Sequence, residues 1–157
     1  MTPCIIESIL AWFAAAIDAI EPGLDPKFTL ASRRPRGLQL DLEQLHDGTV
    51  YVYAGAGHVE SVTLGGVASV RQEIICRICA DQVTADAASV DTRLLAMFSA
   101  VAAAIIGGNT GGSACGGLAK LAEIRDWIFA DAEGVTFCEA TFEVLLSANW
   151  EGFTAVA

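Results

Sequence analysis

The sequence predicts an α+β fold in which an antiparallel sheet of about four strands packs against two or three helices. Two stretches carry this prediction, residues 70–81 (VRQEIICRICAD) and residues 135–150. In each, side chains of one parity are apolar and those of the other include charged groups, as in a strand with one buried and one partly wet face. An apolar, helix-like run separates them, so helices are expected to cover one face of the sheet.

Two elements and a long connection are expected in the first 45 residues. Thr2 can cap a helix that has Pro3 at its first position, and Pro22-Gly23 ends that helix after Ile20. The connection, residues 21–37, holds three of the four prolines and three arginines, and a short strand is expected at residues 27–31. Residues 38–45 (LQLDLEQL) fit either a strand or a short helix.

A strand and a turn are expected before the first long strand. Residues 49–54 (TVYVYA) are β-branched and aromatic, which predicts a strand. Residues 55–66 contain four glycines, which predicts a turn or a flexible loop.

The chain between the two long strands is expected to hold a helix, a loop and a further strand. Asp86 or Ser89 can cap a helix over residues 91–106 (DTRLLAMFSAVAAAII). The glycine-rich residues 107–117 lack both the Gly-Lys-Ser/Thr end of a phosphate loop and the GxGxxG spacing, so a flexible loop is expected there. Residues 118–130 fit two interpretations, either a helix over residues 118–129, or a short helix at 118–122 and a strand at 123–130. The second is preferred, with a turn at 131–134 into the final strand.

Length and composition predict a single domain over residues 1–157. Hydrophobic residues make up 54% of the chain and charged residues 18%, which is enough apolar material for a sizeable core. The 19 acidic residues outnumber the 9 basic ones, giving a net charge of -10. The basic cluster Arg33, Arg34 and Arg36 is too small for a phosphate-binding face, so nucleic-acid binding is not expected. An acidic surface instead lets DNA pass without adhering.

Neither apolar run of the sequence predicts a targeting or membrane segment. The N-terminus has no basic region, and Glu7 interrupts it, so it does not resemble a secretory signal. Residues 94–106 are shorter than the roughly 20 residues of a spanning helix. A soluble cytoplasmic protein is therefore expected.

The five cysteines predict structural thiols. Cys76 and Cys79 have CxxC spacing, but an offset of three in a strand turns the two thiols to opposite faces. No second ligand pair accompanies them for zinc, because the histidines are His46 and His58 alone. No metal and no cofactor is therefore expected.

No catalytic signature stands out. The nucleophile candidates are Cys79 on the polar strand face and Ser113 and Cys115 in the glycine-rich loop, and no motif places a base beside them. The carboxylates Asp41, Glu43 and Asp47 lack the calcium-loop pattern. No catalytic, cofactor-binding or metal-binding residue is assigned, and the protein is not expected to be an enzyme. The aromatic residues Tyr51, Tyr53, Trp127 and Trp150 either anchor an interface or fill the core.

The order of expected elements resembles a known family. An N-terminal helix, a Pro/Arg connection, the strand TVYVYAGA, the long strand VRQEIICRICAD, the helix RLLAMFSAVAAAII and a hairpin ending in GVTFCEATFEVLLSA come one after another. This order resembles the tail terminator (tail completion) proteins of long-tailed bacteriophages and phage-derived particles. The resemblance covers most of the chain and lies in pattern rather than in a diagnostic motif. The glycine-rich loop at 107–117 departs from it.

The resemblance implies a structural virion protein without catalysis. Such proteins form a hexameric ring that caps the head-proximal end of the tail tube, ends tube polymerisation and provides the docking surface for the head or neck. The implied partners are further copies of the chain, the tail tube protein and a head–tail connector or neck protein, with no membrane. The implied location is the virion tail, after assembly in the host cytoplasm.

Two alternatives stay open at this stage. The first is a head–tail connector or neck protein of the same particle. The second is a small enzyme or ligand-binding α+β domain that uses Cys79 or His58.

Two further expectations concern the assembled ring. DNA is expected to pass through its lumen without specific binding, along a wall made net negative by carboxylates such as Asp41, Glu43, Asp47 and Glu60. The connection at 22–37 and the loop at 55–66 are expected to contact neighbouring molecules and to be mobile in the free protein.

Overall fold

The computed structural model describes residues 2–21, 29–35, 48–81, 87–132 and 135–156. Two α-helices are present in these ranges, α1 (Ile5–Asp18) and α2 (Ala87–Ile106), with one 3-10 turn, η2 (Cys115–Gly117). The strands are β1 (Ala31–Arg33), β2 (Thr49–Val62), β3 (Val67–Asp81), β4 (Leu121–Ala132), β5 (Val135–Asn149) and β6 (Thr154–Ala155).

The strands form one mixed sheet, so the expectation of an antiparallel sheet of about four strands is wrong. The order is β1-β2-β3-β5-β4, and β6 pairs with the end of β5. The pairs β2–β3, β3–β5 and β4–β5 are antiparallel, whereas β1 runs parallel to β2 with Ser32 opposite Val50. Of the two short strands, β1 overlaps the strand expected at residues 27–31 only at Ala31, and β6 was not expected.

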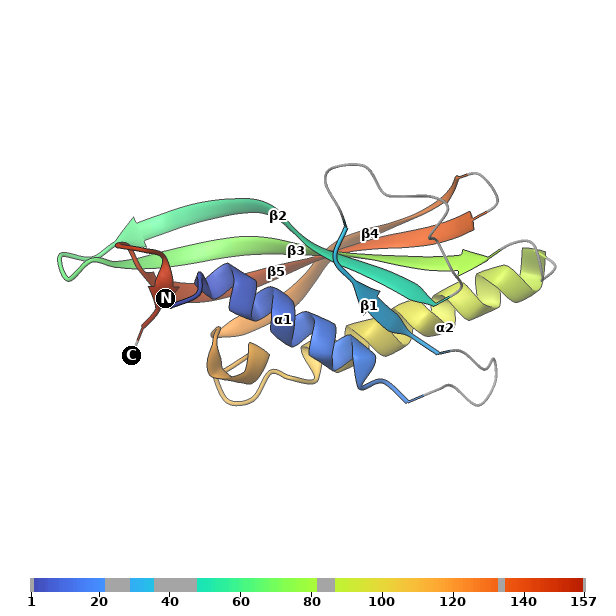
Figure 1. The fold of residues 1–157 in the computed structure, drawn as a ribbon, viewed down its shortest axis with the longest axis horizontal. Helices are drawn as coiled ribbons and strands as arrows, with labels where there is room; N and C mark the ends of the chain where they lie inside the picture. The colour runs from blue at the N-terminus through green and yellow to red at the C-terminus, as the bar shows by residue number, and fades with distance from the viewer. Residues whose placement is uncertain (1, 22–28, 36–47, 82–86, 133–134, 157) are drawn as a thin grey trace.

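Both helices pack against one face of the sheet (Figure 1). The two long predicted strands are confirmed as β3 and β5, and they pair with each other from Val67↔Asn149 to Asp81↔Val135. Their apolar parities face the helices and are fully or almost fully buried, as the sequence predicted. The buried residues of this face in β3 and β5 are Ala68, Val70, Gln72, Ile74, Cys76, Ile78, Ala80, Thr136, Cys138, Ala140, Phe142, Val144, Leu146 and Ala148.

The first helix begins later than expected. Its N-cap position is Cys4 and no side chain caps it, so the predicted cap by Thr2 with Pro3 at the first helical position is wrong. The buried positions Ile5, Ile9, Phe13 and Ile17 recur at helical spacing, and contact with the sheet holds the helix without a cap.

The second helix begins four residues earlier than predicted, at Ala87. Ser89 lies inside α2 and therefore does not cap it. Asp86, which was expected as a possible cap, lies outside the described residues. Residues 38–45, which were expected to form a strand or a short helix, also lie outside them.

Gly55 and Gly57 lie in β2, which corrects the expectation of a turn or loop over all of residues 55–66, whereas Gly65 and Gly66 do lie in a turn. β2 continues to Val62, and only Thr63–Gly66 turns the chain into β3. The register of β2 against β3 shifts between Ala54 and Gly57, and a Cβ on Gly57 would lie 2.6 Å from Oε1 of Gln72, so a larger residue there would require the Gln72 amide to move. The Gln72 amide donates to the carbonyl oxygen of Gly55, which satisfies a buried polar group inside the sheet.

The segment after the second helix is a loop and then a strand. The predicted loop at 107–117 is confirmed, with η2 at its end, and the preferred strand at 123–130 is confirmed as part of β4. The short helix expected at 118–122 is wrong, because Ala119 bridges back to Ala114 and β4 has already begun at Leu121. The alternative helix over 118–129 is wrong for the same reason.

Candidate functional site

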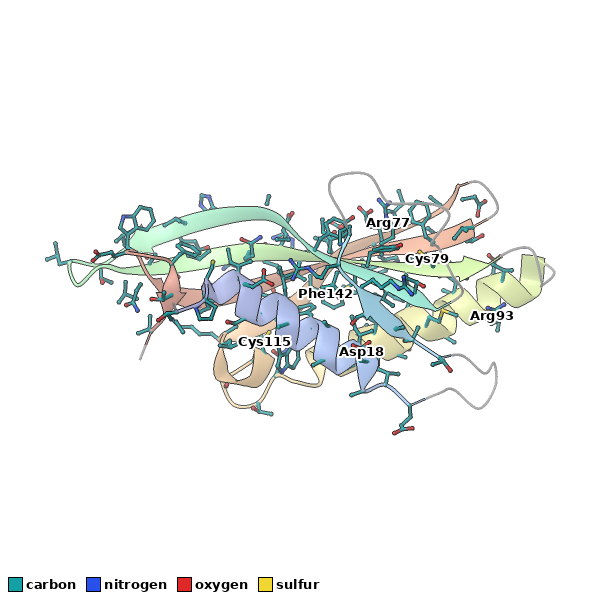
Figure 2. The ribbon with its side chains drawn as sticks, in the orientation of Figure 1. Asp18, Arg77, Cys79, Arg93, Cys115 and Phe142 are labelled. Carbon is teal, nitrogen blue, oxygen red and sulfur yellow. The ribbon has the colours of Figure 1, made fainter. Side chains whose placement is uncertain are left out.

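The CxxC cysteines point to opposite faces of β3, as expected, and both are fully buried. Cys76 belongs to the main core, whereas Cys79 packs with Tyr51 and Val135 on the other face. The expectation that Cys79 lies on a polar, partly wet strand face is therefore wrong. Figure 2 shows Cys79 beside Arg77 on the side of the sheet away from the helices.

Burial makes the inner thiols poor nucleophiles. Desolvation raises the pKa of Cys79 to about 12 although Arg77 opposes it, and desolvation also raises the pKa of Cys115 and Cys138 to about 12. The pKa of Cys76 is raised further by the same cause. Because the thiolate is the reactive form, these groups are inert at neutral pH. The enzyme alternative that used Cys79 loses its nucleophile.

A thiol titration is expected to separate one cysteine from the other four. Cys4 is exposed, whereas Cys76, Cys79, Cys115 and Cys138 are buried and free of disulfides. A thiol reagent at pH 7.5 should modify one thiol quickly in the native protein and five after denaturation, measured by absorbance or mass spectrometry. The Cys4→Ser variant, as a control, should lose the fast phase. Rapid native modification of Cys79 would contradict this assignment.

The other sequence candidates are not brought together. Ser113 lines an open pocket of about 260 Å³ with Lys120 and Ser147, and no histidine or carboxylate is among its lining residues. His58 is exposed on β2. His46, Asp41, Glu43 and Asp47 lie outside the described residues. Within the described part of the chain, no group of three or more His, Cys, Asp or Glu side chains could hold a metal ion.

The face of the sheet away from the helices carries a four-strand ladder of charged groups. Arg71 of β3 bonds Glu60 of β2 and, at 2.7 Å, Glu143 of β5. Arg125 at a register shift in β4 donates to the second oxygen of Glu143 at 2.5 Å. The Glu143 side chain is 9% exposed against 41% for Arg71 and 54% for Arg125. Two guanidinium groups therefore neutralise one nearly buried carboxylate.

A second cross-strand cluster lies along the same face. Arg77 donates to Oε2 of Glu139 at 3.0 and 2.5 Å and lies 4.7 Å from the ring centre of Phe137. The Tyr53 hydroxyl donates to the same carboxylate oxygen at 3.2 Å. Burial raises the pKa of Tyr53, although the Arg77 charge opposes this rise. The arginines of this face are thus already engaged by carboxylates.

The end strand β4 carries exposed apolar side chains on both of its faces. Trp127, Ile128 and Phe129 are 52%, 60% and 41% exposed. Trp127 and Phe129 face α2, where Phe98 lies 5.5 and 6.0 Å from their ring centres. Leu95 of α2 is 54% exposed and lines, with Phe129, an open pocket of about 290 Å³. Such an exposed apolar edge is typical of a contact surface.

Sequence reasoning named Trp127 as a possible interface anchor but missed Ile128 and Phe129. The signal was available, because three consecutive large apolar residues in a strand must place at least one on each face. Of the other aromatic candidates, Tyr51 fills the interior, Tyr53 is half-buried, and Trp150 is 55% exposed in the turn after β5.

The tip of the β2–β3 hairpin is a second exposed apolar region. The hairpin extends beyond the helices (Figure 1). Leu64 at its turn is fully exposed, and Val62 is 47% exposed. Trp150 lies beside this tip, since its amide donates to the carbonyl oxygen of Gly66 at 2.7 Å.

The described helices are not of membrane-spanning type. Neither α1 nor α2 combines sufficient length with sufficient apolar character to cross a membrane.

Comparison with known proteins gives only distant structural likeness. No protein-family model matches the sequence, and no curated protein matches it. A chain from the structure titled "Virion of native gene transfer agent (GTA) particle" is similar over 92% of both chains, at 13% sequence identity and a TM-score of 0.37. At this score and identity the likeness carries no functional argument.

Proposed function

We propose that the protein is a structural subunit of a phage or phage-derived particle. In this proposal it forms a hexameric ring on the head-proximal end of the tail tube, ends tube polymerisation and presents the docking surface for the head or neck. Its partners are other copies of the chain, the tail tube protein and a connector or neck protein.

The observation that carries the proposal is the order of the elements. Helix α1, the hairpin β2–β3, helix α2 and the hairpin β4–β5 come one after another along the chain. The resemblance of the sequence to tail terminator proteins rests on this order.

The distribution of exposed groups supports an assembly role over a catalytic one. The exposed apolar residues gather at two separate places, the β4 edge with Trp127, Ile128 and Phe129, and the hairpin tip with Leu64. A subunit in a stacked ring needs two kinds of contact, one with its neighbours in the ring and one with the next layer. Two separate apolar surfaces meet this need.

The polar face of the sheet supports passage of DNA without binding. Arg71, Arg77 and Arg125 each pair with a carboxylate on this face. A guanidinium group held by a carboxylate offers less attraction to a phosphate, and the net charge of -10 adds a general repulsion. Glu60, the described member of the proposed lumen carboxylates, belongs to this network through Arg71.

Electron microscopy of the purified protein tests the proposal. Negative staining should show rings with a central hole, and native mass spectrometry should give six copies. Added to polymerising tail tube protein encoded in the same genome, the ring should shorten the tubes and appear at one end only. A protein that stays monomeric, or that leaves tube length unchanged and does not bind tube ends, would contradict the proposed role.

The same experiment separates the proposal from a connector or neck protein of the same particle. A neck protein should bind the isolated portal or adaptor and leave tube growth unchanged, whereas a terminator should bind the tube end in the absence of any head component.

A further inference from the structure

We propose that copies of this chain associate head to tail, with the β4 edge of one copy docked on the β1 edge of the next. The acidic edge is defined as Glu123, Asp126, Trp127, Ile128 and Phe129 of β4, and the basic edge as Arg33 and Arg34 at β1. This inference rests on the proposed ring and names the surfaces that close it.

The acidic edge is available for docking. β4 stands at one end of the strand order, and among the described residues no strand pairs with its outer side. The Asn109 side-chain amide accepts a hydrogen bond from the N–H of Ala122 at 3.0 Å and donates one to its C=O at 2.8 Å. The part of the β4 edge whose backbone groups are open to a partner therefore begins after Ala122. Glu123 and Asp126 are exposed and form no ion pair with another described residue. The edge therefore presents backbone groups, carboxylates and aromatic rings together.

The basic edge lies at the opposite end of the same sheet. β1 is the other end strand, and Arg33 is exposed and makes no ion pair with another described residue. Arg34 is exposed and pairs with Glu7 at 3.0 Å. Asp18 at the end of α1 accepts hydrogen bonds from the amide and hydroxyl of Ser32 at 2.7 and 2.8 Å. These bonds fix the position of the strand that carries Arg33 (Asp18 is labelled in Figure 2).

The charge distribution of the chain favours contact between the two edges. Among the described residues, the β1 edge carries Arg33 and Arg34, although the chain as a whole is strongly acidic. The β4 edge carries Glu123 and Asp126, and Arg125 between them is already bonded to Glu143. Two copies meeting through their β4 edges would bring carboxylates together, whereas a β4 edge meeting a β1 edge joins opposite charges.

Arginine suits both components of the acidic edge. Its guanidinium group pairs with carboxylates and stacks on aromatic rings. Arg77 does both within this chain, since it bonds Glu139 and lies 4.7 Å from the ring centre of Phe137. Asp126 and Trp127 are neighbours in β4 and face opposite sides of the sheet, so Arg33 of one copy can make the first of these contacts, the ion pair, with the Asp126 carboxylate of the next.

The two edges are different surfaces, so the contact is heterologous. A heterologous contact leaves each copy with one edge still open, and repetition closes into a ring or extends into a filament. A contact of this type is what a ring of identical subunits requires.

Charge reversal at the two edges tests the inference in the full-length protein. At the proposed pair of positions 126 and 33, Asp126→Arg puts a positive charge on both sides of the contact and Arg33→Glu puts a negative charge on both sides, so each variant alone should lose assembly by about tenfold or more in association constant. Equal mixing should restore assembly with the two variants in equal numbers, because every contact then joins opposite charges. The control Glu151→Arg makes the same change of charge as Asp126→Arg at an exposed turn outside both edges and should assemble normally. Sedimentation velocity and native mass spectrometry give the readouts.

The possible outcomes separate this inference from the proposed function. Restoration by mixing supports the pairing of β4 with β1. Rings that form equally well with either variant overturn the pairing and leave the ring in place. Loss of assembly in Asp126→Arg with none in Arg33→Glu indicates that the β4 edge contacts a surface other than the β1 edge and also overturns the pairing. A wild-type protein that is monomeric at all concentrations overturns both the inference and the proposed ring. Circular dichroism of each variant excludes loss of fold as the cause.

Discussion

Replacing Phe142 with alanine is expected to lower the free energy of unfolding by about 3–5 kcal/mol. Phe142 is fully buried in β5, which lies between β3 and β4, and its ring meets that of Phe13 edge to face at 5.6 Å. Figure 2 shows it at the centre of the molecule, between the sheet and the helices. Truncation leaves a cavity that neither α1 nor the sheet can fill without moving.

Urea denaturation followed by circular dichroism measures this loss. Phe142→Leu keeps most of the volume and should cost less than about 1.5 kcal/mol. Leu64→Ala removes a large apolar side chain that is fully exposed at the hairpin tip, and it should change stability by less than about 0.5 kcal/mol. If Phe142→Ala proved as mild as Leu64→Ala, Phe142 would not lie at the centre of the core.

The parts of the fold that depend on local periodicity could be predicted from the sequence. The alternation in β3 and β5 correctly assigned which side chains enter the core, because the pleat of a strand leaves no other choice. The helical spacing of Ile9, Phe13 and Ile17 in the sequence likewise matches the buried face of α1.

The parts that depend on contacts far apart in sequence could not be predicted. Gly55 and Gly57 signal a turn locally, but the pairing of β2 with β3, with Gly57 opposite Gln72, places them in a strand. The spacing of Leu118, Leu121, Ile124 and Ile128 suits a helix, but pairing with β5 decides in favour of a strand. The parallel strand β1 is too short to carry a pattern and is fixed by bonds from Asp18 and Gly48.

The candidate surfaces were predictable in part. Trp127 stood out as a possible anchor, and the excess of carboxylates was visible in the composition. The placement of Arg33 and Asp126 on opposite edges of the sheet could not be predicted from the sequence, because it depends on β1 and β4 being the two end strands of one sheet. Topology, rather than composition, turns a basic cluster and an acidic strand into complementary edges.

Substituting Gly48 with alanine is expected to loosen β1 and to cost more stability than the same change at Gly66. Both glycines have positive φ, +81° and +77°, so alanine at either position costs about 1–2 kcal/mol for the left-handed backbone. A Cβ on Gly66 meets nothing within 4 Å, whereas one on Gly48 would lie 2.0 Å from the carbonyl oxygen of Thr29.

The clash at Gly48 therefore forces a movement of the backbone at the point where β1 is attached. The Gly48 carbonyl accepts from the amide of Ala31 at 3.0 Å, and its own amide donates to the carbonyl oxygen of Cys79 at 2.9 Å. Losing one of these bonds adds about 0.5–1.5 kcal/mol, so Gly48→Ala should exceed Gly66→Ala by about 1 kcal/mol or more in urea denaturation. Because β1 carries Arg33, Gly48→Ala should also weaken assembly in sedimentation velocity while Gly66→Ala does not. Equal costs for the two variants, with assembly unaffected, would show that β1 is not fixed through Gly48.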